Sequence, residues 1–186
     1  MPPKIKVTKD DIINTALDIV RIHGPQAINA RALATILGCS TQPIFSNFAT
    51  MEDLHLAVAK RADSLFRAYQ QREISGGKYP VYKANGMAYI RFAKEERELF
   101  KLLYMCDRAG APIPKEADLF GSMTDLVHHN TGLDSANATL FHLEMWAYVH
   151  GIATLFATGY LDLDWELVSK MLTDSYLGLR KQYGME

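Results

Sequence analysis

A short segment near the N-terminus, residues 28–48 (INARALATILGCSTQPIFSNF), constrains the fold more than any other part of the sequence. Apolar residues in its first half have the i, i+3, i+4, i+7 spacing of an amphipathic helix: Ala30, Leu33, Ala34 and Leu37. Gly38 begins a three-residue turn, and Pro43 then falls in the first turn of a second short helix, where no hydrogen bond is lost. Two short helices joined by so tight a turn predict a helix-turn-helix, whose second helix enters the DNA major groove.

Turn residues divide the rest of the chain into further helical segments. The clearest breaks are Ser75-Gly76-Gly77 and the proline-rich residues 110–114, because glycine and proline end helices. Alternating β-branched residues, the pattern of strands, are absent. The sequence therefore predicts an all-α protein of about nine helices. They are expected at residues 9–23, 30–37, 41–48, 51–73, 81–93, 95–107, 115–130, 134–158 and 163–183.

Four polar residues are expected to cap the first four helices: Thr8, Asn29, Ser40 and Thr50. Asp11 and Asp53 follow Thr8 and Thr50 at capping-box spacing. At 1.5 Å per residue the fourth helix is roughly 34 Å long, enough to connect two parts of the chain. The predicted division is a helix-turn-helix segment at 1–50, a connecting helix and linker at 51–80, and a larger helical segment at 81–186.

Charge and cysteine content narrow the class of protein. Residues 1–50 carry five lysines and arginines against three acidic residues, whereas residues 51–186 carry fifteen against eighteen. A positive N-terminal part suits contact with nucleic-acid phosphates. Cys39 and Cys106 form no CxxC pair, which argues against a zinc finger or disulfide scaffold and favours the reducing cytoplasm. No signal peptide and no apolar run of 18 or more residues is present, so no membrane contact is expected.

The first 55 residues resemble the N-terminal DNA-binding domain of the TetR/AcrR family of bacterial one-component regulators. The shared positions are Ile12-Ile13-x-x-Ala16-Leu17, His23-Gly24, Arg31-x-Leu33-Ala34-x-x-Leu37-Gly38-Cys39-Ser40, Ile44-Phe45-x-x-Phe48 and Glu52-Asp53-Leu54. Further along, Trp146-Ala147-Tyr148-Val149-His150-Gly151 resembles the Trp–His–Gly signature of one C-terminal subclass. The resemblance implies a homodimer that represses transcription at a palindromic operator on double-stranded DNA and responds to a small apolar or amphipathic effector. It also implies that residues 81–186 form the effector-binding and dimerisation domain.

Two residues depart from the family pattern. The family usually has tyrosine where Phe45 stands and lysine where Met51 stands, and both side chains typically reach phosphates. Since phosphate contacts supply much of the affinity for DNA, binding would depend more on Lys4, Lys6 and helix N-termini. The rival interpretation is a helical ligand-binding or protein-interaction module whose DNA affinity has decayed.

The predicted base contacts lie on the polar face of the third helix. Short hydroxyl and amide side chains exchange hydrogen bonds with base edges, and glutamine pairs bidentately with adenine. Gln42 is the first candidate for reading a base and Thr41 the second, while Pro43 and Phe45 suit a thymine methyl group or a sugar. A solvated helix face is the alternative for each of them. The residues expected on this polar face are Ser40, Thr41, Gln42, Ser46 and Asn47, and Pro43 and Phe45 are expected to contact DNA beside them.

Phosphate contacts are expected from the residues around that helix. Lys4 and Lys6 precede the first helix and could reach phosphate or the minor groove, with a solvated tail as an equal alternative. Arg31 could reach phosphate or be an ordinary surface arginine. Asn29 and Thr50 stand at helix N-termini, whose N–H groups bind phosphate themselves. For these two residues, capping is the favoured role.

The C-terminal segment is rich in aromatic residues and methionines, most of which are expected in the core. Because the resembled family binds effectors in this part, and such pockets are apolar with a few orienting polar groups, we expect Tyr104, Trp146 and His150 to line a ligand site. A hydrogen-bonded core histidine is the favoured alternative for His150. The apolar last helix suits a dimer interface.

An enzyme is disfavoured. A di-metal helical bundle needs paired Glu-x-x-His motifs, and only Glu52-x-x-His55 occurs. No nucleophile elbow, phosphate-binding loop or HExxH motif is present, so neither a cofactor nor a metal is expected. A pure interaction module would need no polar third-helix face, and DNA binding would distinguish it from a regulator.

Overall fold

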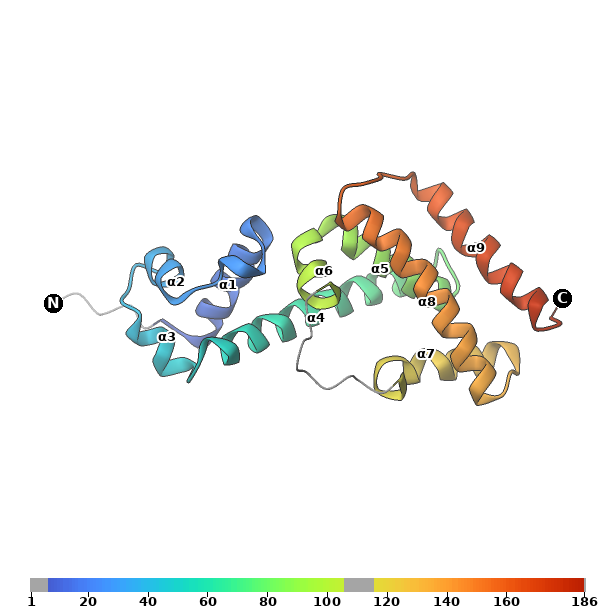
Figure 1. Cartoon of the computed structure of the whole chain (residues 1–186), viewed down its shortest axis with the longest axis horizontal. Helices are drawn as coiled ribbons and strands as arrows, with labels where there is room; N and C mark the ends of the chain where they lie inside the picture. Colours follow the sequence, from blue (N-terminus) through green and yellow to red (C-terminus); the bar gives the residue numbers. More distant parts are fainter. Residues whose placement is uncertain (1–6, 106–115, 186) are drawn as a thin grey trace. The chain divides into compact units, whose positions relative to one another are not determined.

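The computed structural model describes residues 7–105 and 116–185, with side chains for all of these except 116–120 (Figure 1). Every regular element in these residues is helical, which confirms the all-α prediction. Lys4, Lys6, Cys106 and the predicted break at 110–114 lie outside the described residues. None of the described helices combines the length and the apolar character that a membrane crossing needs.

The chain packs as two compact units. The first unit comprises residues 1–67 and 96–106, and the second comprises residues 68–95 and 107–186. The functional division at residues 50 and 80 stays a prediction. Helix α6 follows α5 in the sequence but packs in the same unit as the N-terminal helices. The elements of the first unit are α1 (Lys9–His23), the 3-10 turn η1 (Pro25–Ala27), α2 (Ala30–Ile36), α3 (Gln42–Asn47), most of α4 (Met51–Ser75) and α6 (Arg97–Tyr104).

Side-chain caps fix the starts of three of these helices. The Thr8 hydroxyl accepts from the Asp11 amide at 3.1 Å, and the Asp11 carboxylate accepts from the Thr8 amide at 2.9 Å, which completes a capping box. Thr50 and Asp53 repeat this arrangement at α4 with the same two distances. The Asn29 side chain accepts from the Ala32 amide at 2.9 Å. Three of the four predicted caps are therefore confirmed.

The prediction that Ser40 caps α3 is wrong. Thr41 occupies the N-cap position, and its backbone is already helical (φ −71°, ψ −14°), so its side chain accepts no hydrogen bond from the first turn. Pro43 stands in that turn and removes one N–H group that would need a partner. The turn between α2 and α3 depends on Gly38, whose φ of +63° favours glycine.

The core of the first unit holds α3 by its apolar face. Ile44 is fully buried and Phe48, just after the helix, is 4% exposed. They join completely buried residues of α1, α2 and α4, including Ile12, Leu33 and Leu54. Because interiors are close-packed, these contacts leave α3 little freedom to rotate. Its opposite, polar edge is consequently held outward.

Helix α6 contributes two of the largest buried side chains, Leu99 and Phe100, both fully buried, and it contacts α1 and η1. It is shorter than the predicted 95–107 segment. The backbone of Glu96 leaves helical geometry (φ −122°, ψ 54°), as does that of Met105 (φ −125°, ψ 14°). A bend at Glu96 thus separates α6 from α5.

The second unit is a helical bundle in which α8 packs against α5 and α7 (Figure 1). Its buried residues include Phe92 of α5 and Phe141, Met145 and Phe156 of α8. A β-carbon on Gly86 would lie 3.0 Å from the Leu172 side chain, so glycine permits the close approach of α9 to α5. The elements are the end of α4, α5 (Val81–Glu95), α7 (Glu116–Thr131), α8 (Ser135–Ala157) and α9 (Trp165–Gln182).

Most predicted helix boundaries lie within two residues of the observed ones. Helix α4 continues two residues past the predicted end, to Ser75. Helix α9 begins two residues later than predicted because the Asp164 carboxylate accepts from the amides of Glu166 and Leu167 and so caps it.

Two isoleucines of the first unit test whether burial holds α3 in place. Ile44→Ala should lower the free energy of unfolding by about 2–5 kcal/mol, because it empties a fully buried site. The matched control Ile36→Ala, at a side chain 62% exposed, should stay within about 0.5 kcal/mol of wild type. Urea unfolding followed by circular dichroism measures both, and equal effects of the two substitutions would contradict this packing.

Candidate nucleic-acid interface

The exposed edge of α3 begins at Gln42, the first residue of the helix. Its side chain is exposed and makes no hydrogen bond within the described part of the chain. Thr41 is half-buried at the N-cap. An amide at a helix start, held by a rigid helix and without internal partners, keeps both its donor and its acceptor for a base edge.

Ser46 and Asn47 are less available for hydrogen bonding than the sequence suggests. The Ser46 hydroxyl donates to the Gln42 carbonyl at 2.8 Å, and the Asn47 side-chain amide donates to the Pro43 carbonyl, also at 2.8 Å. Both side chains therefore use donors within α3 itself, as short polar side chains in helices often do. Ser46 retains only acceptor capacity, whereas Asn47 retains its acceptor oxygen and one N–H donor.

Phe45 presents an apolar surface beside Gln42. Its side chain is 50% exposed, although Ile44, one residue earlier, is completely buried. Pro43 is half-buried. A large exposed aromatic ring on a surface that also carries a free amide suits contact with a thymine methyl group or a sugar.

Residues around α3 separate into caps and free cations. Both polar atoms of the Asn29 side chain are engaged, since its amide group also donates to the Ala27 carbonyl at 3.1 Å. Thr50 is likewise engaged with Asp53. Arg31 is exposed in the first turn of α2 and has no ion pair among the described residues. Asn29 and Thr50 therefore have the capping role that the sequence favours, while Arg31 remains free to meet a phosphate.

Two lysines that sequence reasoning missed line a groove of about 390 Å³ beside α3. Lys9 opens α1, with its ammonium group 5.0 Å from the centre of the Phe48 ring. Lys60 lies on α4, on the same face as Asp53, Leu56 and Ala57. The i, i+3, i+4, i+7 spacing of these α4 residues could have indicated a shared face, but which other helix that face meets is not readable from the sequence.

An ion pair fixes α1 against α4 near this groove. Arg61 donates to the Asp10 carboxylate at 2.7 Å and to the Asn14 side-chain oxygen at 2.6 Å. A guanidinium group that joins two side chains of one helix restricts both sliding and rotation. The positions of Lys9 and α3 are therefore set by the same packing.

The predicted ligand residues Trp146 and His150 lie together in the second unit. Their rings stack with centroids 5.0 Å apart and planes 17° from parallel. The Tyr89 hydroxyl lies 2.9 Å from Nδ1 of His150, and burial lowers the pKa of this histidine. His150 is thus hydrogen-bonded and half-buried, which agrees with the alternative of a hydrogen-bonded core histidine. Its ring also forms a flat surface with the Trp146 ring.

A second tyrosine–histidine pair lies on the same two helices. The Tyr82 hydroxyl is 2.8 Å from Nδ1 of His142, seven residues before Tyr89 on α5 and eight before His150 on α8. Burial lowers the pKa of His142 to about 4 and raises the pKa of Tyr82. Both groups are neutral near pH 7, which makes this pair a packing contact rather than an ionic one.

Tyr104, the third predicted ligand residue, belongs to the first unit. Its ring packs against Phe66 and Phe100 with centroid distances of 5.9 and 5.1 Å. Burial raises the pKa of its phenol. Tyr104 therefore packs in a different unit from Trp146 and His150. Among the described residues, no group of three or more acidic, histidine or cysteine side chains could hold a metal ion.

Comparison with known proteins decides the family. The family model described as "Tetracyclin repressor-like, C-terminal domain" matches residues 82–175, half of the chain. The chain belongs to the TetR family. Members are DNA-binding transcriptional regulators rather than enzymes, and the predicted family and TetR-like fold are confirmed. Membership of the Trp–His–Gly subclass stays a prediction.

One curated relative and one solved structure are similar to this chain over most of its length. One is described as an uncharacterized HTH-type transcriptional regulator of Mycobacterium tuberculosis; it is 25% identical over 185 residues, 97% of this chain and 83% of the relative. The other is a solved structure of a protein with unknown function from Rhodococcus sp. RHA1, with a TM-score of 0.68, 22% identity and 97% coverage of both chains. The second similarity shows the fold alone.

The buried His142 gives this TetR-family regulator a pH-dependent stability. Between the unfolded pKa of about 6.5 and the folded pKa of about 4, the unfolded chain binds more protons than the folded chain. The free energy of unfolding should therefore fall as pH falls through this window, by up to about 1 kcal/mol per pH unit. His142→Gln should weaken this dependence of the free energy of unfolding on pH, whereas His129→Gln, at an exposed position, should leave it unchanged. Urea titrations at fixed protein concentration measure this, and equal slopes in wild type and His142→Gln would contradict it.

Proposed function

We propose that this TetR-family regulator binds a palindromic operator as a homodimer, reads bases with α3, and represses transcription until a small apolar or amphipathic effector binds. The observation that carries the proposal is the exposed edge of α3, where the free amide of Gln42 and the ring of Phe45 flank a completely buried Ile44. A helix held from behind with an unsatisfied polar edge is the arrangement that direct readout of the major groove requires.

Within this edge we assign different roles to the predicted residues. Gln42 reads a base, with adenine as the best match, and Thr41 supports it from the N-cap. Phe45 contacts a methyl group or sugar, because it lacks the hydroxyl that would reach phosphate. Ser46 contributes an acceptor oxygen only, and Asn47 contributes its acceptor oxygen and one N–H, since their other donors are used within α3.

Phosphate binding is assigned to cations around α3. Arg31 lies in the first turn of α2, and Lys9 and Lys60 line the groove beside Phe48. Lys4 and Lys6 precede α1 in the sequence. Together these cations compensate for the phenylalanine at 45 and the methionine at 51, whose side chains have no group that binds phosphate. Each phosphate that a cation neutralises should add about 0.9 to the magnitude of the slope of the logarithm of the binding constant against the logarithm of the salt concentration.

Dimerisation is assigned to the outward faces of α8 and α9. These carry exposed apolar side chains, Leu140 and Tyr148 on α8 and Leu167 and Leu177 on α9. Gly151 and Gly178 are also exposed, with open space where a β-carbon would lie. Glycine inside a helix costs about 1 kcal/mol relative to alanine, and no packing within the described chain offsets that cost. Close approach of a second copy of the chain would explain glycine at these two positions. The exposed apolar side chains agree with this, because such patches often mark protein interfaces.

Effector binding is assigned to the second unit. The stacked surface of Trp146 and His150, with Tyr89 fixing the imidazole, offers an apolar wall and one orienting polar group. Tyr104, which lies on α6 in the first unit, stays a separate candidate. Effector binding would shift α6 and lower operator affinity through a coupling of roughly 1–3 kcal/mol. Such a regulator acts in the cytoplasm, where its operator lies.

Gln42→Ala tests base reading. The test uses operator fragments that the wild-type dimer has selected from random DNA. The Gln42→Ala variant should bind them about 1–3 kcal/mol more weakly and lose its base preference at one base pair per half-site, because one bidentate contact disappears. The control Gln26→Ala removes an exposed glutamine from η1, outside the proposed interface, and should bind like wild type. Fluorescence anisotropy at several salt concentrations measures both affinity and salt slope.

Other outcomes of this experiment separate the alternatives. Loss of affinity in Gln42→Ala with an unchanged base preference would overturn the base-reading role. Binding without salt dependence would overturn the phosphate contacts. Failure of the wild-type dimer to bind any duplex in dilute buffer would favour the interaction module with decayed DNA affinity, for which the departures at Phe45 and Met51 are the supporting observation.

A further inference from the structure

Two successive glutamates stand where the chain passes from the second unit into the first. Glu95 is the last residue of α5 and belongs to the second unit, while Glu96 belongs to the first unit and precedes α6. The backbone bends at Glu96 (φ −122°, ψ 54°). Without further restraint, a bend between two helices would absorb a movement of α5 instead of passing it to α6.

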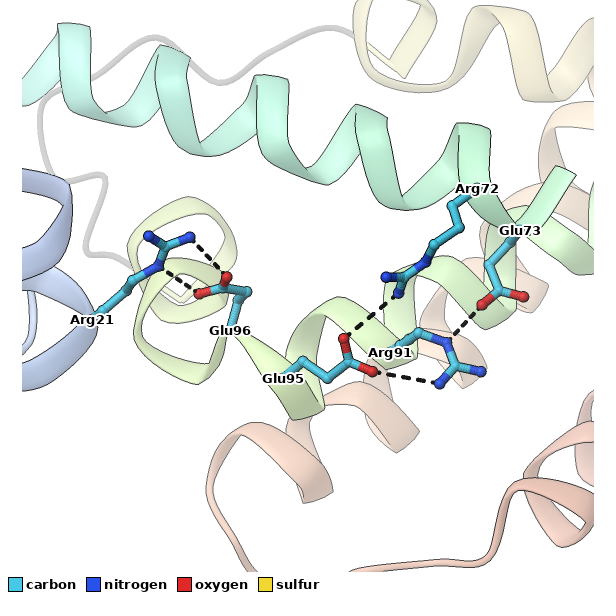
Figure 2. Close-up of polar contacts among 6 residues, drawn as sticks. All are labelled: Arg21, Arg72, Glu73, Arg91, Glu95 and Glu96. Atoms are coloured by element: carbon cyan, nitrogen blue, oxygen red, sulfur yellow. Dashed lines mark hydrogen bonds and ion pairs between the residues drawn. The ribbon is translucent and has the colours of Figure 1, made fainter. Parts of the chain in front are cut away.

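Glu96 is anchored within the first unit by the end of α1 (Figure 2). Its two carboxylate oxygens accept from Nε and Nη2 of Arg21 at 2.9 and 2.8 Å. The Glu96 side chain is 17% exposed, and these hydrogen bonds raise the pKa of Arg21. A two-bond arginine–carboxylate pair fixes orientation as well as distance. It therefore holds the start of α6 in a defined orientation against α1.

Glu95 is anchored separately within the second unit (Figure 2). Its carboxylate pairs with Arg72 of α4 at 3.6 Å and with Arg91 of α5 at 3.4 Å. Arg91 in turn donates to the Glu73 carboxylate at 2.6 Å, and its guanidinium group lies 4.4 Å from the centre of the Trp165 ring. The end of α5 is thus tied to both α4 and the first residue of α9.

We propose that Glu95 and Glu96 are positioning residues that carry movement of the second unit to the DNA-reading unit, because each anchors one side of the α5–α6 bend. The inference rests on the proposed ligand response and specifies how it is transmitted. With both carboxylates held, a displacement at the end of α5 moves the Arg21–Glu96 pair, and α1 moves with it. With either pair removed, the bend rotates and absorbs the displacement.

Allosteric coupling is reciprocal, so an operator duplex is a sufficient probe for this inference. Hydrogen exchange is measured on the full-length wild-type chain with and without an operator fragment that the wild-type dimer has selected from random DNA. Operator binding should slow exchange at the amides of the α5 end and the α9 start, in the second unit. In Glu96→Gln and in Arg21→Met, this distant change should fall by at least about twofold, while operator affinity stays within about twofold of wild type, as expected for a partly exposed ion pair.

The control is Glu98→Gln. The Glu98 carboxylate pairs with Lys101 at 2.7 Å inside α6 and ties α6 to no other helix by an ion pair among the described residues, so the distant exchange change should persist. In a double variant, Arg21→Met with Glu96→Gln, the operator-induced exchange change in the second unit should fall no further than in either single variant, because both residues act through one pair. A merely structural role would lower the free energy of unfolding in the single variants and leave the exchange change in the second unit as in wild type.

Two outcomes would overturn the inference and one concerns the function itself. Operator binding that leaves exchange in the second unit unchanged in wild type would exclude the transmission. Equal distant changes in wild type, Glu96→Gln and Arg21→Met would show that the pair carries none of it. Failure of every variant and of wild type to bind a duplex would overturn the proposed function and the inference that rests on it.

Discussion

Burial of Leu99 and Phe100 is the interaction on which the rest of the structure depends. Both side chains lie on α6, are fully buried, and belong to a helix that contacts α1 and η1. A helix that follows α5 in the chain is therefore built into the unit that carries α3. Because each such aromatic or aliphatic side chain contributes about 1.5–3 kcal/mol when buried, α6 cannot leave α1 without a large decrease in stability. Any signal that reaches α6 consequently reaches α1.

The edge of α3 to which we assign DNA reading follows from the same core. Ile44 and Phe48 fix the back of α3, and Arg61 fixes α1 against α4. The base contact that we propose for the free amide of Gln42 requires that its helix does not rotate. In the second unit, by contrast, the two tyrosine–histidine pairs are neutral packing contacts between α5 and α8. The Tyr89–His150 pair fixes the imidazole that stacks on Trp146 without adding a charge there, which suits the proposed apolar or amphipathic ligand.

Local patterns predict most of the fold, and long-range packing accounts for the differences. Helix spacing, the Thr8 and Thr50 capping boxes and the buried face of α3 are properties of neighbouring residues, so the sequence indicates them directly. Serine is a good cap, which favours Ser40 at the start of α3, but the helical backbone of Thr41 places the N-cap one residue later. The assignment of α6 to the first unit, the Lys9–Lys60 groove and the separate anchors of Glu95 and Glu96 depend on which distant helices meet, and one sequence does not specify that.

The most direct test of this account asks which unit α6 folds with. Ile12→Ala empties a completely buried position on α1 and should destabilise the first unit by about 2–5 kcal/mol. Native-state hydrogen exchange of the full chain should then show faster exchange at the amides of α6 together with those of α1, while α8 exchanges as in wild type. Exchange in α6 that follows α8, and stays unchanged when α1 accelerates, would contradict the account.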